Sequence, residues 1–301
     1  MHASKEHCSQ TRVLIVQIID CRNRAISHFD CVRLHSRPHR GVNERNPRFI
    51  ITRQVLSKKR FGRRFRRLPC LAMKIVIISD IHGNYDALRA LPEEYDELWV
   101  LGDLLNYGPE PREVVTEIMD KAAVVVRGNH DDAVVSTEAA PWKSRWRVTA
   151  EATKQFTASV LSDQQKAFIR SLPLHSRVER EGTSFFLIHA TPSDPLYGHH
   201  SPESDEWASE VKIAAAQVLL VGHSHVPFMR VVGGAVVLNP GSIGQPRNSD
   251  IRASYAVWQD GQFSLRTYIY PVRETVRKIR ALSFPAEVEE DLVSILQTGR
   301  V

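Results

Sequence analysis

The sequence contains no cysteine after Cys70. All four cysteines of the 301-residue chain, Cys8, Cys21, Cys31 and Cys70, lie in its first 72 residues, and their spacing matches no common zinc-binding pattern. The rest of the chain therefore has neither a disulfide nor a thiolate metal ligand, as is usual for proteins of the reducing cytoplasm. Its longest apolar runs are also far shorter than the roughly 20 residues needed to cross a bilayer. We expect a cytoplasmic protein with no membrane partner.

Acidic residues are scarce in residues 1–72. This segment holds 4 of the 34 acidic residues but 17 of the 40 basic ones, so the formal net charge of +6 originates here. The remainder of the chain carries more acidic than basic residues. The main part of the chain therefore gives no reason to expect nucleic-acid binding.

Residues 1–72 also differ from the rest in character, with an Arg-rich run at 58–67. Three interpretations are open: a basic arm for nucleic acid or a membrane surface, an Arg-rich organellar presequence, or a translated leader without a stable fold. We favour the third, because Met73 directly precedes the first buried strand. The sequence thus predicts a poorly ordered basic segment at 1–72, with nucleic-acid binding by it not expected, and one domain at 73–301.

Five short apolar runs within residues 73–301 each end on a polar residue that can bind metal. The residues following these runs are Asp80 and His82, Asp103, Asn129 and His130, His189, and His223 and His225. Short runs rich in β-branched and large apolar residues are typical of strands buried on both faces. Side chains just past such strands lie on the rim of the sheet, where open α/β folds bind ligands. The five endings therefore predict one shared site.

The order of the expected elements indicates the fold class. Residues 73–126 alternate strand and helix signals, and residues 144–171 contain two helical stretches, the second beginning at Ser162. Glycine-containing turns near 182, 233 and 261 separate pairs of apolar segments and predict hairpins. We therefore expect an α/β (α+β) protein with two packed sheets, partly parallel and partly antiparallel, and helices outside them.

The candidate site residues suit two divalent cations. Asp80 and His82 are two positions apart, and in an extended chain both would project to the same side. The Asp103 carboxylate has two oxygens and can bridge two ions, while Asn129 offers a neutral carbonyl oxygen. With three further imidazoles and no thiolate, the set allows Mn²⁺, Fe²⁺, Zn²⁺, Ni²⁺ or Co²⁺ and leaves the identity open.

A pair of such ions predicts a particular reaction. Two metals about 3.5–4 Å apart can deprotonate a bridging water, whose hydroxide attacks phosphorus in line, while they bind the phosphoryl oxygens. His130, beside Asn129, is well placed to protonate the leaving group. Arg127 is a candidate to clamp the phosphate, because a guanidinium matches phosphate oxygens bidentately; its alternative is an ion pair with Asp131 or Asp132.

This motif set resembles that of the calcineurin-like metallophosphoesterase superfamily. The residues that carry the resemblance are Asp80-x-His82, Gly102-Asp103, Gly128-Asn129-His130-Asp131, His189 and Gly222-His223-Ser224-His225, in the order of that family. The resemblance covers residues 73 to the end. It is strongest to the branch of small single-domain bacterial and archaeal phosphodiesterases, in part through the segment 239–247 after the last motif.

The resemblance implies a two-sheet αββα sandwich and a phosphoester substrate, and it allows a homodimer. It assigns the ligands to two metal sites: Asp80, His82, Asp103 and His225 for one, and Asp103, Asn129, His189 and His223 for the other. It also gives His130 contact with phosphate and the role of leaving-group acid. Whether the substrate is a diester or a monoester stays open.

Two other classes of function compete with a phosphohydrolase. The same fold could be a catalytically silent, metal-bound scaffold or regulatory binding module, although such a protein usually lacks some ligands and this chain lacks none. The Arg-rich segment alone could make the protein a nucleic-acid binder, in which case salt-sensitive binding should disappear with that segment.

Overall fold

The computed structural model describes residues 16–18, 73–142 and 146–300 of the chain. By its internal contacts the chain divides into a unit of residues 1–23 and 72–301 and a unit of residues 24–71. All described strands and helices belong to the first unit. The predicted basic segment at 1–72 lies outside the described residues, apart from 16–18.

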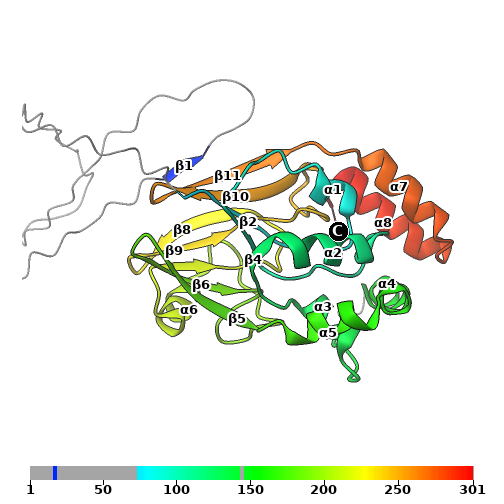
Figure 1. Ribbon diagram of the computed structural model, residues 1–301, viewed down its shortest axis with the longest axis horizontal. Coiled ribbons are helices and arrows are strands. Elements are labelled where there is room, and N and C mark those ends of the chain that lie inside the picture. The colour runs from blue at the N-terminus through cyan, green and yellow to red at the C-terminus, as the bar shows by residue number, and fades with distance from the viewer. Residues whose placement is uncertain (1–15, 19–72, 143–145, 301) are drawn as a thin grey trace, which may run out of the picture. The chain divides into compact units, whose positions relative to one another are not determined.

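Two mixed sheets form the centre of the first unit (Figure 1). The strands of the first sheet, in spatial order, are β1 (Val16–Ile18), β11 (Gln262–Tyr268), β10 (Ala253–Gln259), β2 (Ile75–Ile78), β3 (Glu97–Val100) and β4 (Ala122–Val125). Those of the second are β5 (His175–Arg180), β6 (Thr183–Ile188), β7 (Val218–Leu220), β9 (Ala235–Asn239) and β8 (Phe228–Val232). β2, β3 and β4 run parallel to one another, as do β6, β7 and β9, whereas the hairpin partners β10–β11, β5–β6 and β8–β9 are antiparallel.

The two sheets pack face to face through alternate residues of their strands. In β2, Ile75 and Ile77 join Trp99 of β3 in an apolar cluster that also contains Phe185 and Trp258. The intervening residues of β2 point the other way, into a cluster with the helices. This alternation is the two-residue period of a strand, and burial on both faces explains the unbroken apolar runs in the sequence.

Helices cover the outer faces of both sheets. The helices are α1 (Tyr85–Arg89), α2 (Pro111–Lys121), α3 (Asn129–Val135), α4 (Arg147–Val160), α5 (Asp163–Ser171), α6 (Trp207–Ala214), α7 (Val272–Ala281) and α8 (Ala286–Thr298). Apolar residues of α1, α2 and α5 pack on the first sheet, and those of α6 pack on the second. The architecture is therefore the predicted two-sheet sandwich with helices outside.

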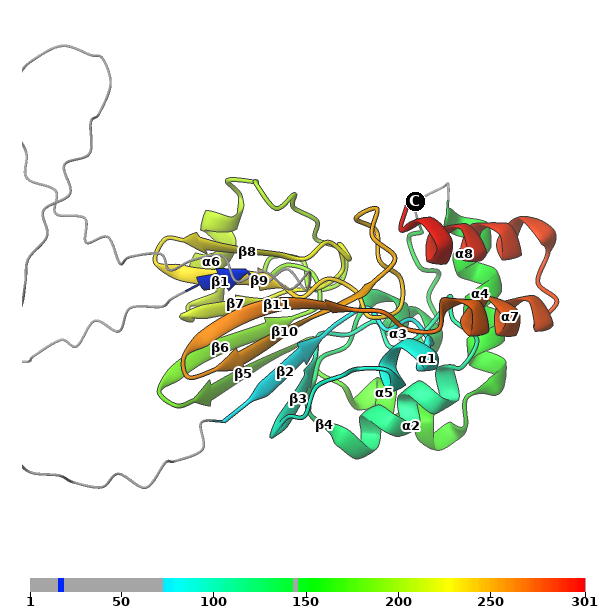
Figure 2. The same ribbon diagram turned by 90° about the horizontal axis from the view of Figure 1, so that it is seen from above.

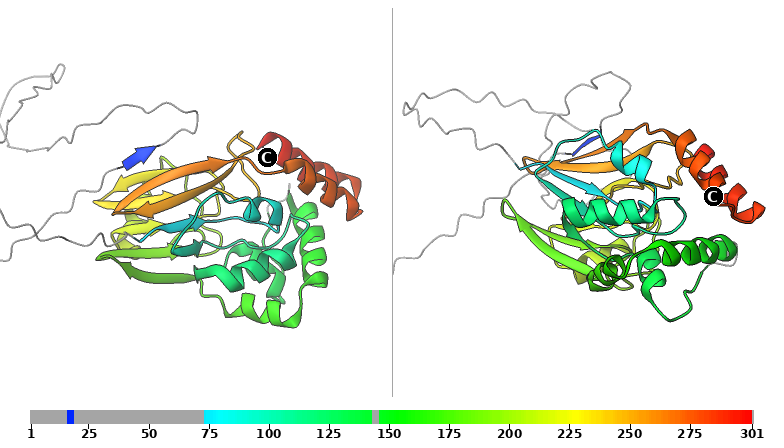
Figure 3. Two further views of the ribbon diagram at one scale, coloured as in Figure 1. Left: turned by 45° about the horizontal axis from the view of Figure 1, so that its top comes forward. Right: turned by 45° about the vertical axis from the view of Figure 1, so that its right-hand side comes forward.

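Most helices gather beyond one end of the strands (Figure 2). The parallel strands β2 and β3 run toward this end, so the loops that follow them open there. The last two helices, α7 and α8, lie at the same end and share an apolar cluster with residues of α4 (Figure 3). No helix in the described part of the chain has the length and apolar character required to span a bilayer.

The helix boundaries and the burial of the strands match the sequence predictions only in part. The Ser162 hydroxyl caps α5, accepting a hydrogen bond from the Gln165 N–H at 3.2 Å, as its N-cap position predicts. Helices α3 and α6 were not expected; α3 begins directly on the motif residue Asn129. β4 is only partly buried, because it lies at the edge of its sheet.

Candidate metal centre

The candidate site lies where both sheets end, between the loops that follow β2, β3, β4, β6 and β7. The backbone in these loops is unusual, because many non-glycine residues there have a positive φ. The site residues with this conformation are Asp80 (53°), His82 (48°), Asp103 (55°), His223 (63°) and His225 (58°). Residues held in this sparsely populated region cost of order 1 kcal/mol each and cluster at functional sites.

This conformation corrects one step of the sequence reasoning. Asp80 and His82 do approach each other, but not as alternate residues of an extended strand. The chain turns sharply after β2, and the backbone N–H of His82 donates to the Asp103 carbonyl at 2.9 Å. A tight turn tied to the neighbouring loop therefore brings the two side chains together.

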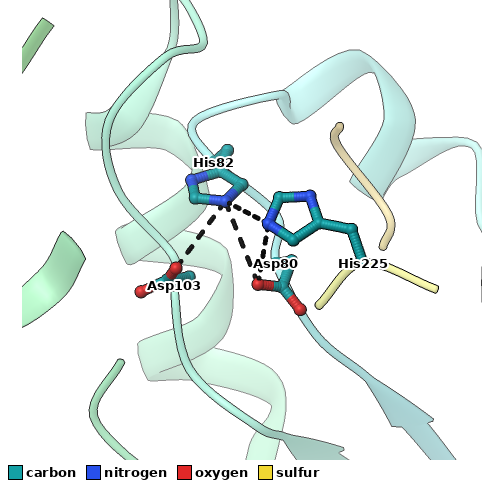
Figure 4. Close-up of side chains that lie close together, drawn as sticks. All are labelled: Asp80, His82, Asp103 and His225. Carbon is teal, nitrogen blue, oxygen red and sulfur yellow. Dashed lines mark hydrogen bonds and ion pairs between the residues drawn. The ribbon is translucent and has the colours of Figure 1, made fainter. Parts of the chain in front are cut away.

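Four side chains form the first cluster of potential metal ligands: Asp80, His82, Asp103 and His225 (Figure 4). The Nε2 atoms of His82 and His225 are 3.2 Å apart. His225 Nε2 lies 3.2 Å from Asp80 Oδ1, and His82 Nε2 lies 3.7 Å from Asp103 Oδ2. All four residues are buried, so their ligand atoms converge on one point inside the protein.

A second cluster contains Asp103 again, with His189 and His223. His189 Nε2 lies 3.3 Å from Asp103 Oδ2. Asn129 closes the group, since its Oδ1 lies 3.0 Å from His189 Nε2 and 3.0 Å from His223 Nδ1. The first sheet supplies Asp103 and Asn129 and the second sheet supplies both histidines, so the sandwich itself assembles the cluster.

The donor set fits divalent cations. Asp80 Oδ1 and Asp103 Oδ2 are fully buried and accept no backbone hydrogen bond from the described residues, and while His225 and His189 are neutral the Nε2 atoms that face them carry lone pairs rather than protons. A buried charged acceptor without a partner costs more than the roughly 1–3 kcal/mol of an unpaired neutral group, and a cation beside both carboxylates would remove that cost. Imidazole nitrogens with carboxylate and amide oxygens suit borderline first-row metals, and no thiolate is present.

Backbone carbonyls orient three of the histidines. The Nδ1–H groups of His82, His189 and His225 donate to the carbonyls of Leu105 at 2.9 Å, Leu101 at 2.8 Å and Gln245 at 2.6 Å, respectively. Since a carbonyl only accepts, each ring keeps its proton on Nδ1 and turns the lone pair of Nε2 toward the cluster. His223 differs, because its Nδ1 faces Asn129.

Burial and the carboxylates set the charges of the histidines. Burial lowers the pKa of His82 to about 3 and that of His223 to about 3, although Asp103 opposes both shifts. Burial alone would also lower the pKa of His189, but the adjacent Asp103 carboxylate outweighs it and raises that pKa to about 9. In the absence of metal, His189 therefore carries a second proton, on Nε2 facing Asp103, at neutral pH, and a metal ion would have to displace it.

We expect the metal-free protein to be most stable near neutral pH. Below about pH 6.5 the unfolded chain binds protons on His82 and His223, whereas the folded chain does not until about pH 3. Burial raises the pKa of Asp131 to about 7, so this residue offsets part of the loss, and stability should fall by about 1–3 kcal/mol per pH unit on acidification. Between about pH 6.5 and pH 9 the folded chain keeps the His189 proton that the unfolded chain has lost, so stability falls again as pH rises.

Urea unfolding with a chelator at about pH 5, 6.5 and 8.5 measures this profile. Saturating Mn²⁺ should abolish the fall in the free energy of unfolding between about pH 6.5 and pH 9, because a metal-bound His189 is neutral at every pH in that range. A metal-free protein with the same stability at all three pH values would contradict the expectation.

Asp131 is a structural residue of the site whose role the sequence reasoning missed. It is fully buried in the first turn of α3. Its Oδ1 accepts hydrogen bonds from the N–H groups of Leu104 at 2.8 Å and Leu105 at 3.1 Å, and its Oδ2 accepts one from Gly128 at 3.0 Å. Asp131 thereby ties the loop after Asp103 to the loop before Asn129. The sequence signal for this role was the place of Asp131 within the motif Gly128-Asn129-His130-Asp131.

We expect Asp131→Asn to lower the free energy of unfolding by about 1–3 kcal/mol. An amide has one acceptor oxygen, so its NH₂ group would face either Gly128 N–H or the two leucine N–H groups. Urea unfolding at about pH 8, where the Asp131 carboxylate is ionised, measures the change. Asp132→Asn is the matched control: its partly exposed ion pair with Arg127 should contribute less than about 1 kcal/mol. Equal losses in both variants would contradict the proposed role.

Gly128 has no space for a side chain. A Cβ atom at this position would lie 2.1 Å from Asp103 Oδ1 and 2.3 Å from the Asp103 backbone nitrogen. Two loops from neighbouring strands therefore touch through bare backbone, and this contact sets the place of the shared carboxylate.

His130 lies beside the first cluster. Its ring is 5.0 Å from that of His82 between centroids, and its backbone N–H donates to Asp103 Oδ1 at 2.8 Å. Asn106 Nδ2 lies 2.9 Å from His130 Nδ1, a contact that the sequence did not suggest. With the amide nitrogen donating, the neutral ring carries its proton on Nε2. The Trp142 ring stacks on the His130 ring, with 4.8 Å between their centroids.

Arg127 is engaged away from the clusters. Its Nε lies 3.3 Å from Asp132 Oδ1, and its Nη1 donates to the Arg170 carbonyl at 3.1 Å. This is the ion pair considered as the alternative to phosphate binding, with Asp132 rather than Asp131 as the partner. The phosphate-binding role of Arg127 stays a prediction that no contact tests.

The comparisons with known proteins agree with the fold and the site. A sequence model of the calcineurin-like phosphoesterase superfamily domain matches residues 73–259, and the chain belongs to this superfamily. An uncharacterised protein of Methanocaldococcus jannaschii is 29% identical over 241 residues, which cover 72% of this chain and 96% of the relative. A symmetrical bis(5'-nucleosyl)-tetraphosphatase of Nitrosococcus oceani is 34% identical over 130 residues, but these cover only 39% of this chain and 44% of that enzyme.

Solved structures show the same architecture. A metallophosphoesterase from Sphaerobacter thermophilus superposes with a TM-score of 0.64 at 28% identity, over 76% of this chain and 99% of that one. A hypothetical protein from Pyrococcus horikoshii gives a TM-score of 0.65 at 20% identity, over 76% of this chain and 99% of that one, and at that identity it supports the fold alone. The predicted family and fold are therefore confirmed.

Proposed function

We propose that this protein is a phosphoester hydrolase that depends on two divalent metal ions, and that residues 73–301 form its catalytic domain. One observation carries the proposal: two clusters of buried ligand atoms share Asp103, and a carboxylate oxygen of Asp80 and one of Asp103 face the cluster imidazoles without a backbone hydrogen bond from the described residues. Membership of the calcineurin-like superfamily supports it. A phosphoester is the substrate class that we propose.

The ligands divide between the two ions as their contacts suggest. Asp80, His82, Asp103 and His225 would hold one ion, and Asp103, Asn129, His189 and His223 the other. Bound there, two divalent ions would lower the pKa of water to give a nucleophile and would offset the charge on the phosphoryl oxygens. We propose Mn²⁺, Fe²⁺, Zn²⁺, Ni²⁺ or Co²⁺ on the basis of the nitrogen and oxygen donors.

His130 is the proposed leaving-group acid, and with Asn129 it would also contact the phosphate. Burial lowers the pKa of His130 well below its usual value, and a bound phosphate would raise it again by its negative charge. The Asn106 amide and the Trp142 ring restrict the imidazole, so Nε2 is the nitrogen available to the substrate. Once phosphate has raised the pKa enough for the ring to become an imidazolium, the proton would pass from Nε2 to the oxygen that leaves phosphorus, and the ring would return to its neutral form.

Chelator-treated protein reloaded with each candidate ion tests the proposal. We expect turnover of bis(p-nitrophenyl) phosphate or p-nitrophenyl phosphate only with metal, together with about two bound ions per chain. Bound metal without turnover on either substrate and on a wider phosphoester panel would instead support the metal-bound scaffold. Turnover that persists after the chelator treatment would contradict the role of the ions.

A further inference from the structure

Arg247 carries a positive charge beside the candidate metal centre that no motif residue explains. Its Nη2 donates to Gln245 Oε1 at 2.6 Å, a neutral acceptor. Its Nε is buried and has no hydrogen-bond partner in the described part of the chain. No carboxylate of the described residues forms an ion pair with it. A half-buried guanidinium with an unused donor and no counter-charge is suited to an anion.

The segment 239–247 fixes the place of this guanidinium. The N–H of Gly244 donates to the Asp80 carbonyl at 3.0 Å, and the Ser242 hydroxyl donates to the same carbonyl at 2.7 Å. Two residues before Arg247, the Gln245 carbonyl accepts the hydrogen bond from His225. The segment is thus bound to two potential metal ligands, and Arg247 is held at a set position relative to them.

The contacts of Arg247 place it on the His130 side of the site. Its guanidinium lies beside the Tyr107 hydroxyl, and its charge and hydrogen bond oppose the burial that raises the pKa of Tyr107 to about 12. The Tyr107 ring in turn lies 4.9 Å from the ring of His82 and 4.7 Å from that of His130 between centroids. Arg247, Tyr107 and His130 therefore form a continuous group.

We propose that Arg247, with Tyr107, forms an anion subsite for a phosphate carried by the leaving group. This inference rests on the proposed function, in which His130 protonates the leaving oxygen. The substrate class that it specifies is a phosphoanhydride, or an ester whose leaving alcohol bears a phosphate. A neutral alcohol would leave the Arg247 charge without a partner, whereas a departing phosphate brings its own negative charge to it.

One P–O bond forms and one P–O bond breaks in the proposed reaction. The oxygen of water forms a bond to the attacked phosphorus, and the bond from that phosphorus to the bridging oxygen breaks. The bridging oxygen departs with the electron pair as part of the second phosphate and takes a proton from His130, and Arg247 holds that anion. One proton of the water stays with the attacked phosphate, and the other restores His130. The products are two phosphate groups in place of one anhydride and one water.

A matched pair of substrates tests the subsite in the Mn²⁺-loaded full chain. Bis(p-nitrophenyl) phosphate expels a phenol, and the corresponding symmetrical bis(p-nitrophenyl) diphosphate expels a phosphate ester. We expect Arg247→Gln to lower kcat/KM for the diphosphate by about 10- to 100-fold and for the diester by less than about 3-fold. Arg247→Lys should lose an intermediate amount, because lysine keeps the charge but not the fork of donors. Arg273→Gln, on the exposed face of α7, is the matched control and should change neither value.

Binding provides a second measurement that does not need turnover. Imidodiphosphate, whose P–N–P link replaces the anhydride, and inorganic phosphate are titrated calorimetrically into the Mn²⁺-loaded protein. Arg247→Gln should weaken the binding of imidodiphosphate by about 10-fold or more and the binding of phosphate by much less. Equal losses on both substrates, or equal weakening of both ligands, would overturn the subsite and place Arg247 on the transferred phosphoryl group. Absence of turnover with the selective loss of imidodiphosphate binding would reject the proposed hydrolase but keep the subsite.

Discussion

Asp103→Asn should lower metal-dependent kcat/KM by about 10²- to 10⁴-fold, since charge stabilisation by metal ions supplies several kcal/mol to such reactions. Asp103 belongs to both clusters of ligand atoms, so one change weakens both ions. Asparagine has nearly the same shape and can still accept the His130 backbone N–H, now 2.8 Å from Oδ1. The loss should therefore come from the missing charge rather than from a displaced loop. Metal analysis should show fewer bound ions per chain together with the loss of rate.

Asp120→Asn provides the control for Asp103→Asn. Asp120 is exposed near the end of α2, and its replacement removes the same charge without touching the site. We expect its rate and metal content to match those of the unchanged protein. An Asp103→Asn variant that keeps full metal content and full activity would contradict the shared-carboxylate site, and a thermal unfolding curve would show whether the variant is folded.

His130→Asn should lower kcat by about 10²- to 10⁴-fold for substrates with a poor leaving group, such as an alkyl phosphate. The effect should be much smaller for p-nitrophenyl substrates, because p-nitrophenolate departs without a proton. KM should change less than kcat if the lost proton transfer occurs in the transition state. Initial rates on the two kinds of leaving group measure the difference.

The control for this change is His175→Asn, an exposed histidine in β5 whose ring contacts Phe186. It should leave both substrates unaffected. A His130→Asn variant whose losses were equal for alkyl and p-nitrophenyl leaving groups would argue against an acid and in favour of phosphate binding alone. Arg247→Gln should behave differently, since its effect on kcat/KM should depend on the charge of the leaving group rather than on the need of that group for a proton.

The order of strands and motifs was readable in the sequence because it depends on local pattern. Unbroken apolar runs such as Ile75–Ile78 require burial on both faces, and the polar residue after each run must then stand at the rim of a sheet. Chain order, together with the resemblance to a known superfamily, was enough to predict a two-sheet sandwich. The structure brings all seven predicted ligands together at one end of it.

Several supporting residues were not readable, because their roles depend on contacts between distant segments. Asn106 contacts the ring of His130, which is 24 positions away in the sequence. Asp131 accepts a hydrogen bond from the N–H of Leu104, which is 27 positions away. Arg247 was part of a segment noted only for its resemblance, while the more conspicuous Arg127 proved to be paired with Asp132. Arg247 and Arg127 are the same residue type, and only their positions in three dimensions show which of them lies beside the site.

The sequence by itself determined which donor atoms are available and that they follow strands. Only the tertiary structure decided how they combine, because Asp103 and Asn129 belong to one sheet and His189, His223 and His225 follow strands of the other. The packing of the two sheets and the left-handed turns after the strands bring those atoms within reach of one another. No local pattern encodes that approach, since it depends on the relative position of two sheets joined through an apolar core.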